Sequence, residues 1–292
     1  IAWLVDPDLR TWTRRITQVA KNQANPPKTT KDVRKALEDK NVDVVSIATP
    51  NHWHSLMTIW ACQAGKDVYV EEPACHNVYE GTKMVEAARR YNRMVQVGSQ
   101  SRSMAWRKQA IGLLKSGVIG DIYMAKGLCY KRRKSIGKAP VEPVPAGIDW
   151  DQFLGPAPMR PFNPLTHPRR WRAFMEYGNG IVGDMCVHML DMARWMMGLG
   201  WPLSVSSSGG ILMDKASKAN ITDTQEATFD FGDVKVVWTH RSWGTAPDPK
   251  YPWGATFYGE KGTLKASVMG YDFIPVGKGE AVHKDVKYEF DE

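Results

Sequence analysis

The chain has 292 residues, of which 43% are hydrophobic and 24% are charged, and its formal net charge is +8. This composition is typical of a globular protein with one large domain or two ordinary ones, and no apolar run approaches the roughly 18 residues of a membrane span. The positive charge favours anionic ligands in general, a dinucleotide phosphate as readily as a nucleic acid. Because the densest basic run, residues 131–134, is short and has no nucleic-acid-binding motif beside it, we expect neither nucleic acid nor membrane among the partners.

The four cysteines, Cys62, Cys75, Cys129 and Cys186, are scattered and form neither a CxxC pair nor a metal-type Cys/His spacing. We expect free thiols and no metal site, and this cysteine usage suits a reducing compartment such as the cytoplasm. The sequence starts at Ile1, inside a predicted strand. We therefore expect the native N-terminus to lie upstream, and the sequence carries no information on export.

The first 120 residues alternate apolar, strand-like runs with helical segments. The predicted strands are 1–6, 41–50, 66–73 and 93–100, and the predicted helices are 29–39, 54–65, 79–92 and 104–117. Alternation at this spacing is typical of a parallel, doubly wound sheet. We therefore expect an α/β domain of the nucleotide-binding, Rossmann type over residues 1–120.

From residue 121 onward the pattern changes. A longer alternating strand is predicted at 122–133, a Pro/Gly-rich loop at 137–168 and a helix at 184–197. Beyond Gly200, three alternating runs separated by turns predict an antiparallel meander: 202–211, 226–243 and 254–268. We therefore expect residues 121–292 to form an α+β domain with an open, mainly antiparallel sheet.

Polar or turn-forming residues follow four predicted strands of the first domain. They are Asp6, Thr49-Pro50-Asn51, Glu71-Glu72-Pro73 and Gly98-Ser99-Gln100. Ligands of doubly wound sheets bind at the carboxyl ends of the strands. One such end carries little information, but four of them indicate a site.

A second candidate site lies in residues 178–191. There Asp184, His188 and Asp191 follow the i, i+4, i+7 spacing that places them on one face of a helix. A carboxylate one turn from an imidazole can orient the ring and fix its tautomer, as acid/base chemistry requires. The alternative is a capped helix start with a structural histidine.

With these two sites in view, the chain resembles the Gfo/Idh/MocA family of oxidoreductases. The resemblance rests on the strand–helix–strand block at 48–73 and on the Trp-Arg, glycine-rich, Asp-xxx-His-xx-Asp block at 171–191. It implies an enzyme that binds NAD or NADP and moves a hydride to or from a carbon of a sugar, cyclitol or polyol. It also implies a homo-oligomer, a dimer or tetramer, assembled through the sheet of the second domain.

The resemblance assigns residues to the cofactor and to the substrate. Asp6 would bind the adenosine ribose, and its charge would repel a 2′-phosphate, so that NAD is favoured over NADP. The remaining cofactor-binding residues would be Thr49, Pro50, Asn51, His54, Glu71, Pro73, Gln100, Trp171 and Arg172. His188 would be the acid/base and would reach the substrate with Asp184. Tyr130 and Lys131 either face the substrate or belong to a solvated strand end.

Two departures from the family pattern matter. The family's Glu-Lys-Pro reads Glu71-Glu72-Pro73 here, so Glu72 stands in the place of the usual acid/base lysine. Glu72 could be a base in a dehydrogenase. Its presence also leaves open an NAD-dependent glycosidase or lyase that acts through transient oxidation, and a non-catalytic cofactor or sugar binder.

The second departure is the absence of the family's glycine-rich loop, which would precede the strand at 1–6. Without this loop the chain lacks the backbone amides that would bind the pyrophosphate. We therefore expect a chain truncated at both ends, an internal piece of a longer gene product that by itself binds a dinucleotide poorly.

Overall fold

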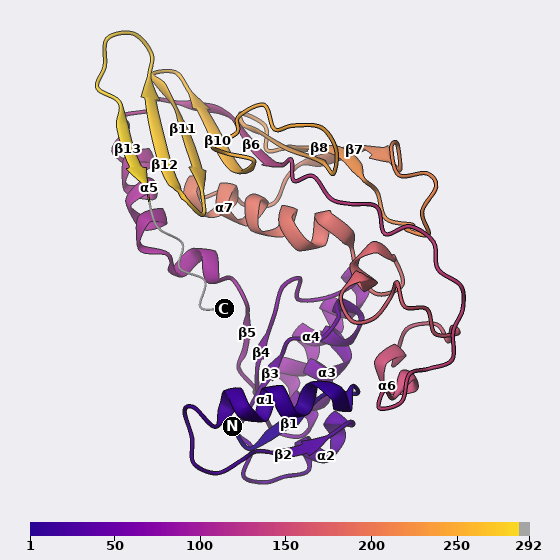
Figure 1. Cartoon of the computed structure of the whole chain (residues 1–292). Coiled ribbons are helices and arrows are strands. Elements are labelled where there is room, and N and C mark those ends of the chain that lie inside the picture. The colour runs from indigo at the N-terminus through magenta and orange to yellow at the C-terminus, as the bar shows by residue number, and fades with distance from the viewer. Residues whose placement is uncertain (286–292) are drawn as a thin grey trace. The chain divides into compact units, whose positions relative to one another are not determined.

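Figure 1 shows the computed structural model of the chain, which describes residues 1–285. Residues 1–98 and 138–179 form one compact unit, unit 1, and residues 99–137 and 180–285 form unit 2. This arrangement differs from a single boundary at residue 120 because the chain passes from one unit to the other three times. The segment 138–179 returns to unit 1, where Leu9 N donates to Gly147 O and Asp149 N donates to Pro7 O.

Unit 1 contains two parallel sheets. In the first, β1 (Trp3–Val5) pairs with β2 (Lys28–Thr30), and in the second β4 (Asp67–Val70) lies between β3 (Val44–Ile47) and β5 (Val95–Val97). The predicted parallel α/β organisation is therefore confirmed. The predicted helix at 29–39 was wrong in its first part, since Thr29 and Thr30 pair with Leu4 and Val5. β-branched residues fit such a ladder well.

The helices of unit 1 follow the strands closely. They are η1 (Leu9–Thr11), α1 (Trp12–Val19), α2 (Val33–Leu37), α3 (Asn51–Gln63), α4 (Val78–Arg90), α6 (Trp150–Leu154) and η3 (Arg170–Ala173). The core lies where α3 and α4 pack against the β3–β5 sheet, with Ile47, Val70, Ala61 and Cys62 almost fully buried. The last two helices lie in or next to the region that the sequence predicts as loop. There the rings of Trp150 and Phe153 stack at 4.9 Å and build a separate aromatic core.

Unit 2 contains one eight-stranded sheet. Its strands are β6 (Ile122–Cys129), β7 (Ser204–Gly210), β8 (Thr224–Asp230), β9 (Lys235–Arg241), β10 (Trp253–Gly259), β11 (Gly262–Ser267), β12 (Gly270–Pro275) and β13 (Val282–Asp285), in the order β13-β12-β11-β10-β6-β9-β8-β7. All pairs are antiparallel except β6 with β9. The predicted mainly antiparallel sheet is confirmed. The simple meander is not, because β6 is inserted between β9 and β10.

Helices cover one face of this sheet (Figure 1). They are η2 (Gln100–Ser103), α5 (Ala105–Lys115) and α7 (Val187–Met197), and α7 is preceded by a π-helical turn, η4 (Val182–Cys186). Met189 and Met192 of α7 are buried against Trp238 and Phe257 of the sheet. This packing fixes the helix that carries His188. Among residues 1–285, no helix has the length and apolar character that crossing a membrane requires.

Candidate active site

In unit 1 the ring of His54 joins the ends of β3 and β4. Its Nε2 lies 2.9 Å from Thr49 O and its Nδ1 lies 2.7 Å from Pro73 O, and only 1% of the residue is exposed. A buried ring with both nitrogens engaged is a structural brace. The ring of His54 therefore holds the backbone after β3 and the backbone after β4 together.

Gly98, at the end of β5, lies directly against Glu71, at the end of β4. A Cβ atom at Gly98 would lie 2.6 Å from Glu71 Oε2 and 3.3 Å from Glu71 Cα. A side chain at position 98 would force the Glu71 carboxylate to move. The polar ends of β3, β4 and β5, predicted to meet, do lie side by side.

The N-terminus of α3 is covered by residues 171–178, which are distant in the sequence. Trp171 is 5% exposed, and the guanidinium of Arg172 lies over its ring at 4.1 Å. A Cβ at Gly178 would lie 2.9 Å from Trp171 Cζ3 and 3.2 Å from Asn51 Nδ2. Three predicted cofactor residues, Asn51, Trp171 and Arg172, are therefore brought together within unit 1.

Asp6 closes β1 and is half-buried. Its Oδ1 accepts from Asp8 N and its Oδ2 accepts from Thr11 Oγ1, both at 2.8 Å. Next to it, Asp8 is 3% exposed and forms a bidentate pair with Arg10 at 2.7 Å. The hydrogen bond from Arg10 holds the pKa of Asp8 below its usual value. The loop after β1 is thus an ordered, negatively charged end.

In unit 2 the candidate acid/base pair lies at the junction of η4 and α7. Asp184 is in the π turn, and its Oδ2 lies 3.4 Å from Nη2 of Arg133. His188 is in the first turn of α7 and is half-buried. The expected uniform α-helix from 184 was wrong for residues 184–186, because a π turn has i→i+5 bonds. Such turns occur frequently at functional sites.

The third residue of the motif, Asp191, has a different partner. Its carboxylate binds Arg102 of η2 with Nε–Oδ2 at 2.8 Å and Nη2–Oδ1 at 2.5 Å. A bidentate pair of this kind fixes both side chains. No local sequence signal points to Arg102. Arg133 lies in the basic run at 131–134, for which the sequence predicts no site residue beyond Lys131.

The other predicted residues of unit 2 are in different environments. Tyr130 is 8% exposed, its N donates to Pro252 O at 2.7 Å and the guanidinium of Arg241 lies over its ring at 4.6 Å. Lys131, the next residue, is exposed, as is Gln100 on η2. Within the described part of the chain, no group of three or more His, Cys, Asp or Glu side chains is arranged to hold a metal ion.

Two family models match the chain. The model described as "Oxidoreductase family, NAD-binding Rossmann fold" matches residues 9–99, and that of the GFO/IDH/MocA C-terminal domain matches residues 108–265. The second match alone covers more than half of the chain. The chain belongs to the Gfo/Idh/MocA family. The resemblance found in the sequence is confirmed.

Curated relatives of this family cover part of the chain. It is 29% identical over 170 residues to levoglucosan dehydrogenase of Pseudarthrobacter phenanthrenivorans, a match that covers 58% of the chain and 36% of the relative. It is 28% identical over 198 residues to scyllo-inositol 2-dehydrogenase (NAD(+)) of Bacillus subtilis. This match covers 68% of the chain and 47% of the relative. The chain therefore spans about a third to a half of the length of these two relatives.

Solved structures share the fold. Aldose-aldose oxidoreductase from Caulobacter crescentus, complexed with glycerol, has a TM-score of 0.73 at 17% identity, with 100% of this chain and 77% of that chain covered. Levoglucosan dehydrogenase in complex with NADH and levoglucosan has a TM-score of 0.69 at 19% identity, with 98% and 71% covered. The predicted fold class, a Rossmann-like domain followed by a mainly antiparallel sheet, is confirmed.

The strand ends of unit 1 fit the NAD that this Gfo/Idh/MocA member's Rossmann-type domain implies. Thr49 Oγ1 is buried and has no hydrogen-bond partner among residues 1–285. Gly98 packs directly against Glu71, and Gly178 packs against Trp171 and Asn51, so the missing side chains let these three candidate cofactor residues lie at the strand ends. Each carboxylate oxygen of Asp6 accepts one hydrogen bond and keeps capacity for another, as a ribose hydroxyl requires.

Residues 178–183 match the pattern G-x-G-x-x-G of a dinucleotide-binding loop, but they are not the family's phosphate-binding loop. The fingerprint requires a strand before the glycines and a helix after them. Here the preceding element is η3 and the following element is the π turn η4. The segment leads into the acid/base motif.

Proposed function

We propose that the protein is an NAD-dependent dehydrogenase that transfers a hydride between the nicotinamide and a carbon of a sugar, cyclitol or polyol. The observation that carries the proposal is Asp184 beside Arg133 at the π–α junction, one helical turn before His188. The family membership and the polar strand ends of unit 1 support it.

Unit 1 is proposed to hold the cofactor. Asp6 would accept hydrogen bonds from the adenosine ribose, and its charge selects NAD over NADP. The strand-end residues Thr49, Pro50, Asn51, Glu71 and Pro73 would line the dinucleotide, with His54 as their brace, and Gln100, Trp171 and Arg172 would contact it from other segments. NAD, when bound, supplies the hydride acceptor.

Unit 2 is proposed to bind and activate the substrate. His188 would take the proton from the hydroxyl that is oxidised, and Asp184 would orient a substrate hydroxyl or the imidazole. Lys131, exposed beside Tyr130, would contact the substrate periphery. Tyr130 itself is mainly buried, so we assign it a supporting role.

Steady-state kinetics of the full-length protein with NAD and a panel of sugars, inositols and polyols test this function through the nicotinamide absorbance. His188→Ala should lower kcat by about 10²-fold or more, as expected for a general acid/base. His283→Ala, in an exposed histidine of β13, is the control and should leave kcat unchanged. Equal activity of His188→Ala and wild type would reject the assignment.

Glu72 favours a second candidate function. A carboxylate stands where the family has its lysine, and its Oε2 atom is buried. A glycosidase or lyase that oxidises the sugar transiently would release an aglycone without net formation of NADH. Mass analysis of the products from glycosides therefore separates this activity from that of a dehydrogenase. Tight binding of NAD without turnover of any substrate would favour a non-catalytic binder.

We also propose a homo-oligomer formed through the uncovered face of the unit 2 sheet. Met124, Tyr258, Thr263 and Ile274 lie opposite one another on β6, β10, β11 and β12, and the three apolar side chains are 38–46% exposed. An apolar row on an open sheet is typical of an interface. A monodisperse monomer in light scattering would contradict this proposal.

A cytoplasmic location is proposed as well. It is supported by the four cysteines, which are all free thiols and suit a reducing compartment.

A further inference from the structure

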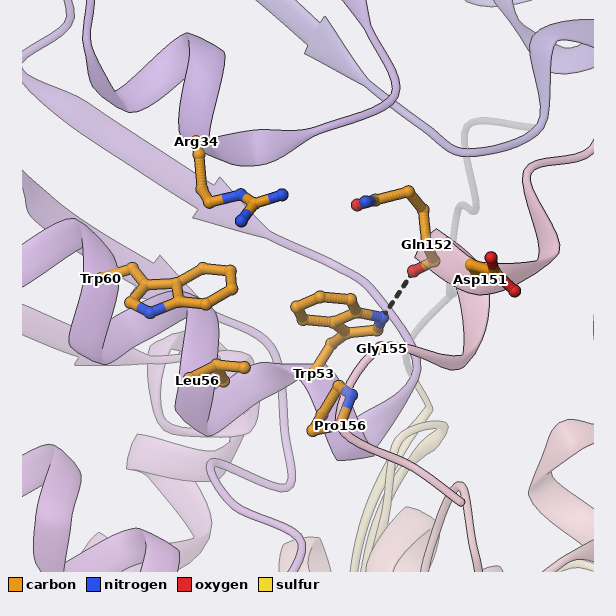
Figure 2. Close-up of a pocket in the computed structure, with 8 residues that line it drawn as sticks. All are labelled: Arg34, Trp53, Leu56, Trp60, Asp151, Gln152, Gly155 and Pro156. Atoms are coloured by element: carbon orange, nitrogen blue, oxygen red, sulfur yellow. Dashed lines mark hydrogen bonds between the residues drawn. The ribbon is translucent and has the colours of Figure 1, made fainter. Parts of the chain in front are cut away.

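The pocket of about 250 Å³ between α3 and α6 in unit 1 has its aromatic walls covered by the protein itself (Figure 2). Trp53 is only 6% exposed, and the backbone of Gly155 lies against its ring. The guanidinium of Arg34 lies over the ring of Trp60, 5.7 Å from its centre. Neither indole therefore offers a free face, and we assign no ligand to this pocket.

Two surface segments of unit 2 lie side by side. The first segment, residues 131–137, follows β6, and the second segment, residues 211–221, follows β7. The side chain of Ser135 donates to Asp214 Oδ1 at 2.8 Å, and the backbone N–H of Lys218 donates to the end of the first segment at 2.9 Å. These hydrogen bonds tie the two segments together.

The second segment is ordered by a buried carboxylate. Asp223 is 8% exposed, and its oxygens accept from the backbone N–H groups of residues 212–214, each at 2.9 Å, and from Thr224 Oγ1 at 2.8 Å. A carboxylate that accepts several backbone N–H bonds fixes the chain around it. The second segment therefore has a defined course beside the first.

Both segments border the turn that carries the candidate acid/base pair. From the first segment, Arg133 Nη2 lies 3.4 Å from Asp184 Oδ2. From the second, Ile221 packs against Gly180, where a Cβ atom would overlap Ile221 Cγ2. Gly180 lies just before η4, the turn that contains Asp184. A substrate bound at Asp184 and His188 would therefore lie next to both segments.

The charges on the two segments are almost all positive. Their cationic residues are Lys131, Arg132, Arg133, Lys134, Lys215 and Lys218, and Asp214 is their one acidic residue. The whole chain has 39 Lys and Arg against 31 Asp and Glu, so composition does not explain this local excess. All of these cations are exposed, and within residues 1–285 Arg133 is the one among them that forms an ion pair. Unpaired like charges on neighbouring segments repel one another and attract an anion.

We propose that the substrate of unit 2 is an acidic sugar, cyclitol or polyol, which carries a carboxylate or phosphate group. The anionic group binds the unpaired lysines of the two segments, while the hydroxyl to be oxidised meets His188. A substrate amine is repelled by the same charges. This inference rests on the proposed dehydrogenase function and narrows its substrate class.

Initial rates of the full-length protein with NAD test the substrate class on matched pairs. The pairs are glucuronate and glucose 6-phosphate against glucose, galacturonate against galactose, and myo-inositol 1-phosphate against myo-inositol. We expect kcat/KM for at least one acidic compound to exceed that of its neutral partner by at least about tenfold, mainly through KM. Added salt should lower the acidic value more than the neutral one, because salt screens exposed charges. Equal kcat/KM within every pair, or a preference for glucosamine over glucose, would overturn the proposal.

Substitution of one lysine on each segment locates the anion. Lys134→Gln combined with Lys215→Gln should lower kcat/KM for the acidic compound by at least about tenfold, and that for its neutral partner by less. Neither side chain forms an ion pair within residues 1–285, so the fold should be retained. Lys278→Gln, in an exposed lysine between β12 and β13, is the matched control and should change neither value. Equal losses for the acidic and the neutral compound would overturn the proposal.

Calorimetry on the same pairs separates this inference from the proposed function. If no compound is oxidised, selective binding of an acidic compound that the double lysine variant loses would support the inference and contradict the dehydrogenase function. If neutral compounds are oxidised as well as acidic ones, the dehydrogenase function stands and the inference fails. Absence of both selective turnover and selective binding of the acidic compounds would overturn the inference.

Discussion

The guanidinium of Arg133 lies 3.4 Å from the carboxylate of Asp184, and the two residues are 51 positions apart in the sequence. The backbone explains this approach: Arg133 N donates to Ser242 O at 3.0 Å, which fixes the segment after β6 beside the sheet. A guanidinium at this distance orients the carboxylate. Arg133 is thus a positioning residue for the candidate acid/base pair.

Replacement of Arg133 should therefore impair catalysis through Asp184. We expect Arg133→Ala to lower kcat by about tenfold, which corresponds to about 1.4 kcal/mol, and Arg133→Lys to recover part of the loss. The adjacent exposed Arg132 is the control, and Arg132→Ala should retain kcat. Equal losses in both variants would indicate a general charge effect on the substrate.

The position of α7 depends on Gly127 of β6. A Cβ there would lie 2.9 Å from Met189 Cβ, on the helix that carries His188. Gly127→Ala should displace α7 and lower the free energy of unfolding by about 1–3 kcal/mol, as overpacking does, and kcat should fall with it. Denaturant unfolding and kinetics of the same samples measure both effects.

Gly112 provides the matched control for this substitution. It lies in α5, and a Cβ there would meet no atom within 4 Å. Gly112→Ala should therefore raise the free energy of unfolding by about 0.5–1 kcal/mol, since alanine favours a helix. A destabilised Gly112→Ala variant, or a Gly127→Ala variant with wild-type stability, would contradict the packing described here.

His52 makes unit 1 sensitive to acid. Burial lowers its pKa to about 4 from 6.5, and its nitrogens lie 3.1 Å from Phe153 O and 3.4 Å from Tyr177 O. The unfolded chain binds the proton at a higher pH than the folded chain does. The contribution of His52 to stability is therefore complete above pH 6.5 and is lost as the pH falls toward 4, by about 3 kcal/mol in total.

Denaturant unfolding across this pH window tests the effect. His52→Gln should have a shallower decrease of stability between pH 6.5 and 4 than the wild type. Parallel curves for wild type and His52→Gln would show that His52 is not the group that titrates.

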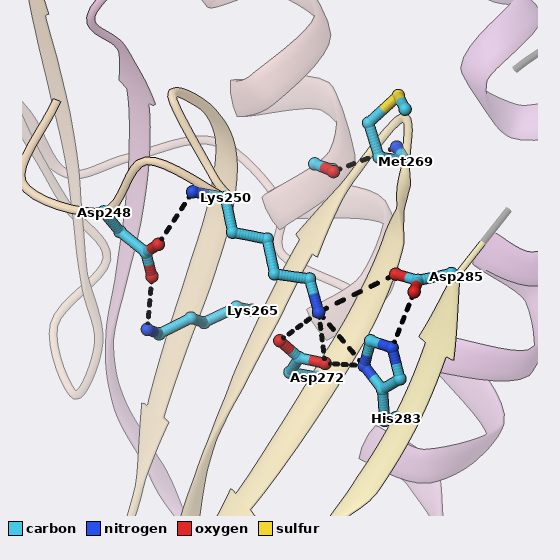
Figure 3. A network of polar contacts seen from close by, with 8 residues as sticks. Asp248, Lys250, Lys265, Met269, Asp272, His283 and Asp285 are labelled. Atoms are coloured by element: carbon cyan, nitrogen blue, oxygen red, sulfur yellow. Dashed lines mark hydrogen bonds and ion pairs between the residues drawn. The ribbon is translucent and has the colours of Figure 1, made fainter. Parts of the chain in front are cut away.

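An exposed histidine on β13, His283, has the opposite pH dependence. Figure 3 shows its ring beside Asp272, Asp285 and Lys250. His283 contacts Asp272 and Asp285, and these hydrogen bonds raise its pKa above 6.5. Lys250 joins the same network, with Nζ 3.1 Å from Asp272 Oδ2 and 3.7 Å from Asp285 Oδ1, and Tyr251 also bonds Asp272. The protonated ring thus links β13 to β12.

Because the folded-state pKa is raised, the stabilisation by His283 is complete below pH 6.5 and is lost as the pH rises through the higher folded value. The unfolding midpoints of wild type and His283→Gln should differ most below pH 6.5 and converge in alkaline buffer. A difference that grows with pH would refute this sign. Salt should reduce it, since the groups are exposed.

The sequence predicted the fold where local patterns decide it. The sequence predicted β3, β4 and β5 and the residues beside them, because a short apolar run bounded by polar or turn-forming residues is a clear local signal. The place of β6 between β9 and β10 could not be predicted in this way. Its pairing with His240 and Trp253 joins residues more than a hundred positions apart, and local alternation carries no information on such partners.

The contacts of the candidate site residues could not be predicted from the sequence. His54 was expected to line the cofactor, yet its ring spans the carbonyls of Thr49 and Pro73. The bidentate pair of Arg102 with Asp191 and the π turn at Asp184 depend on packing that no spacing encodes. The sequence thus indicates which chemical groups are present, whereas only the structure shows which partner each group contacts.

Glu72 is the residue whose replacement tests the chemistry most directly. It stands between Glu71 and Pro73 at the end of β4, and its Oε2 atom is buried. Glu72→Lys would restore the family's Glu-Lys-Pro but would place a longer, cationic side chain where a carboxylate is buried, near the proposed position of the oxidised nicotinamide. We expect turnover to be abolished, because a positive charge opposes the oxidised ring. Glu72→Gln, which removes the charge and keeps the shape, should lose less activity. If the wild type is inactive and Glu72→Lys gains dehydrogenase activity, the glutamate at this position is what inactivates an otherwise functional active site.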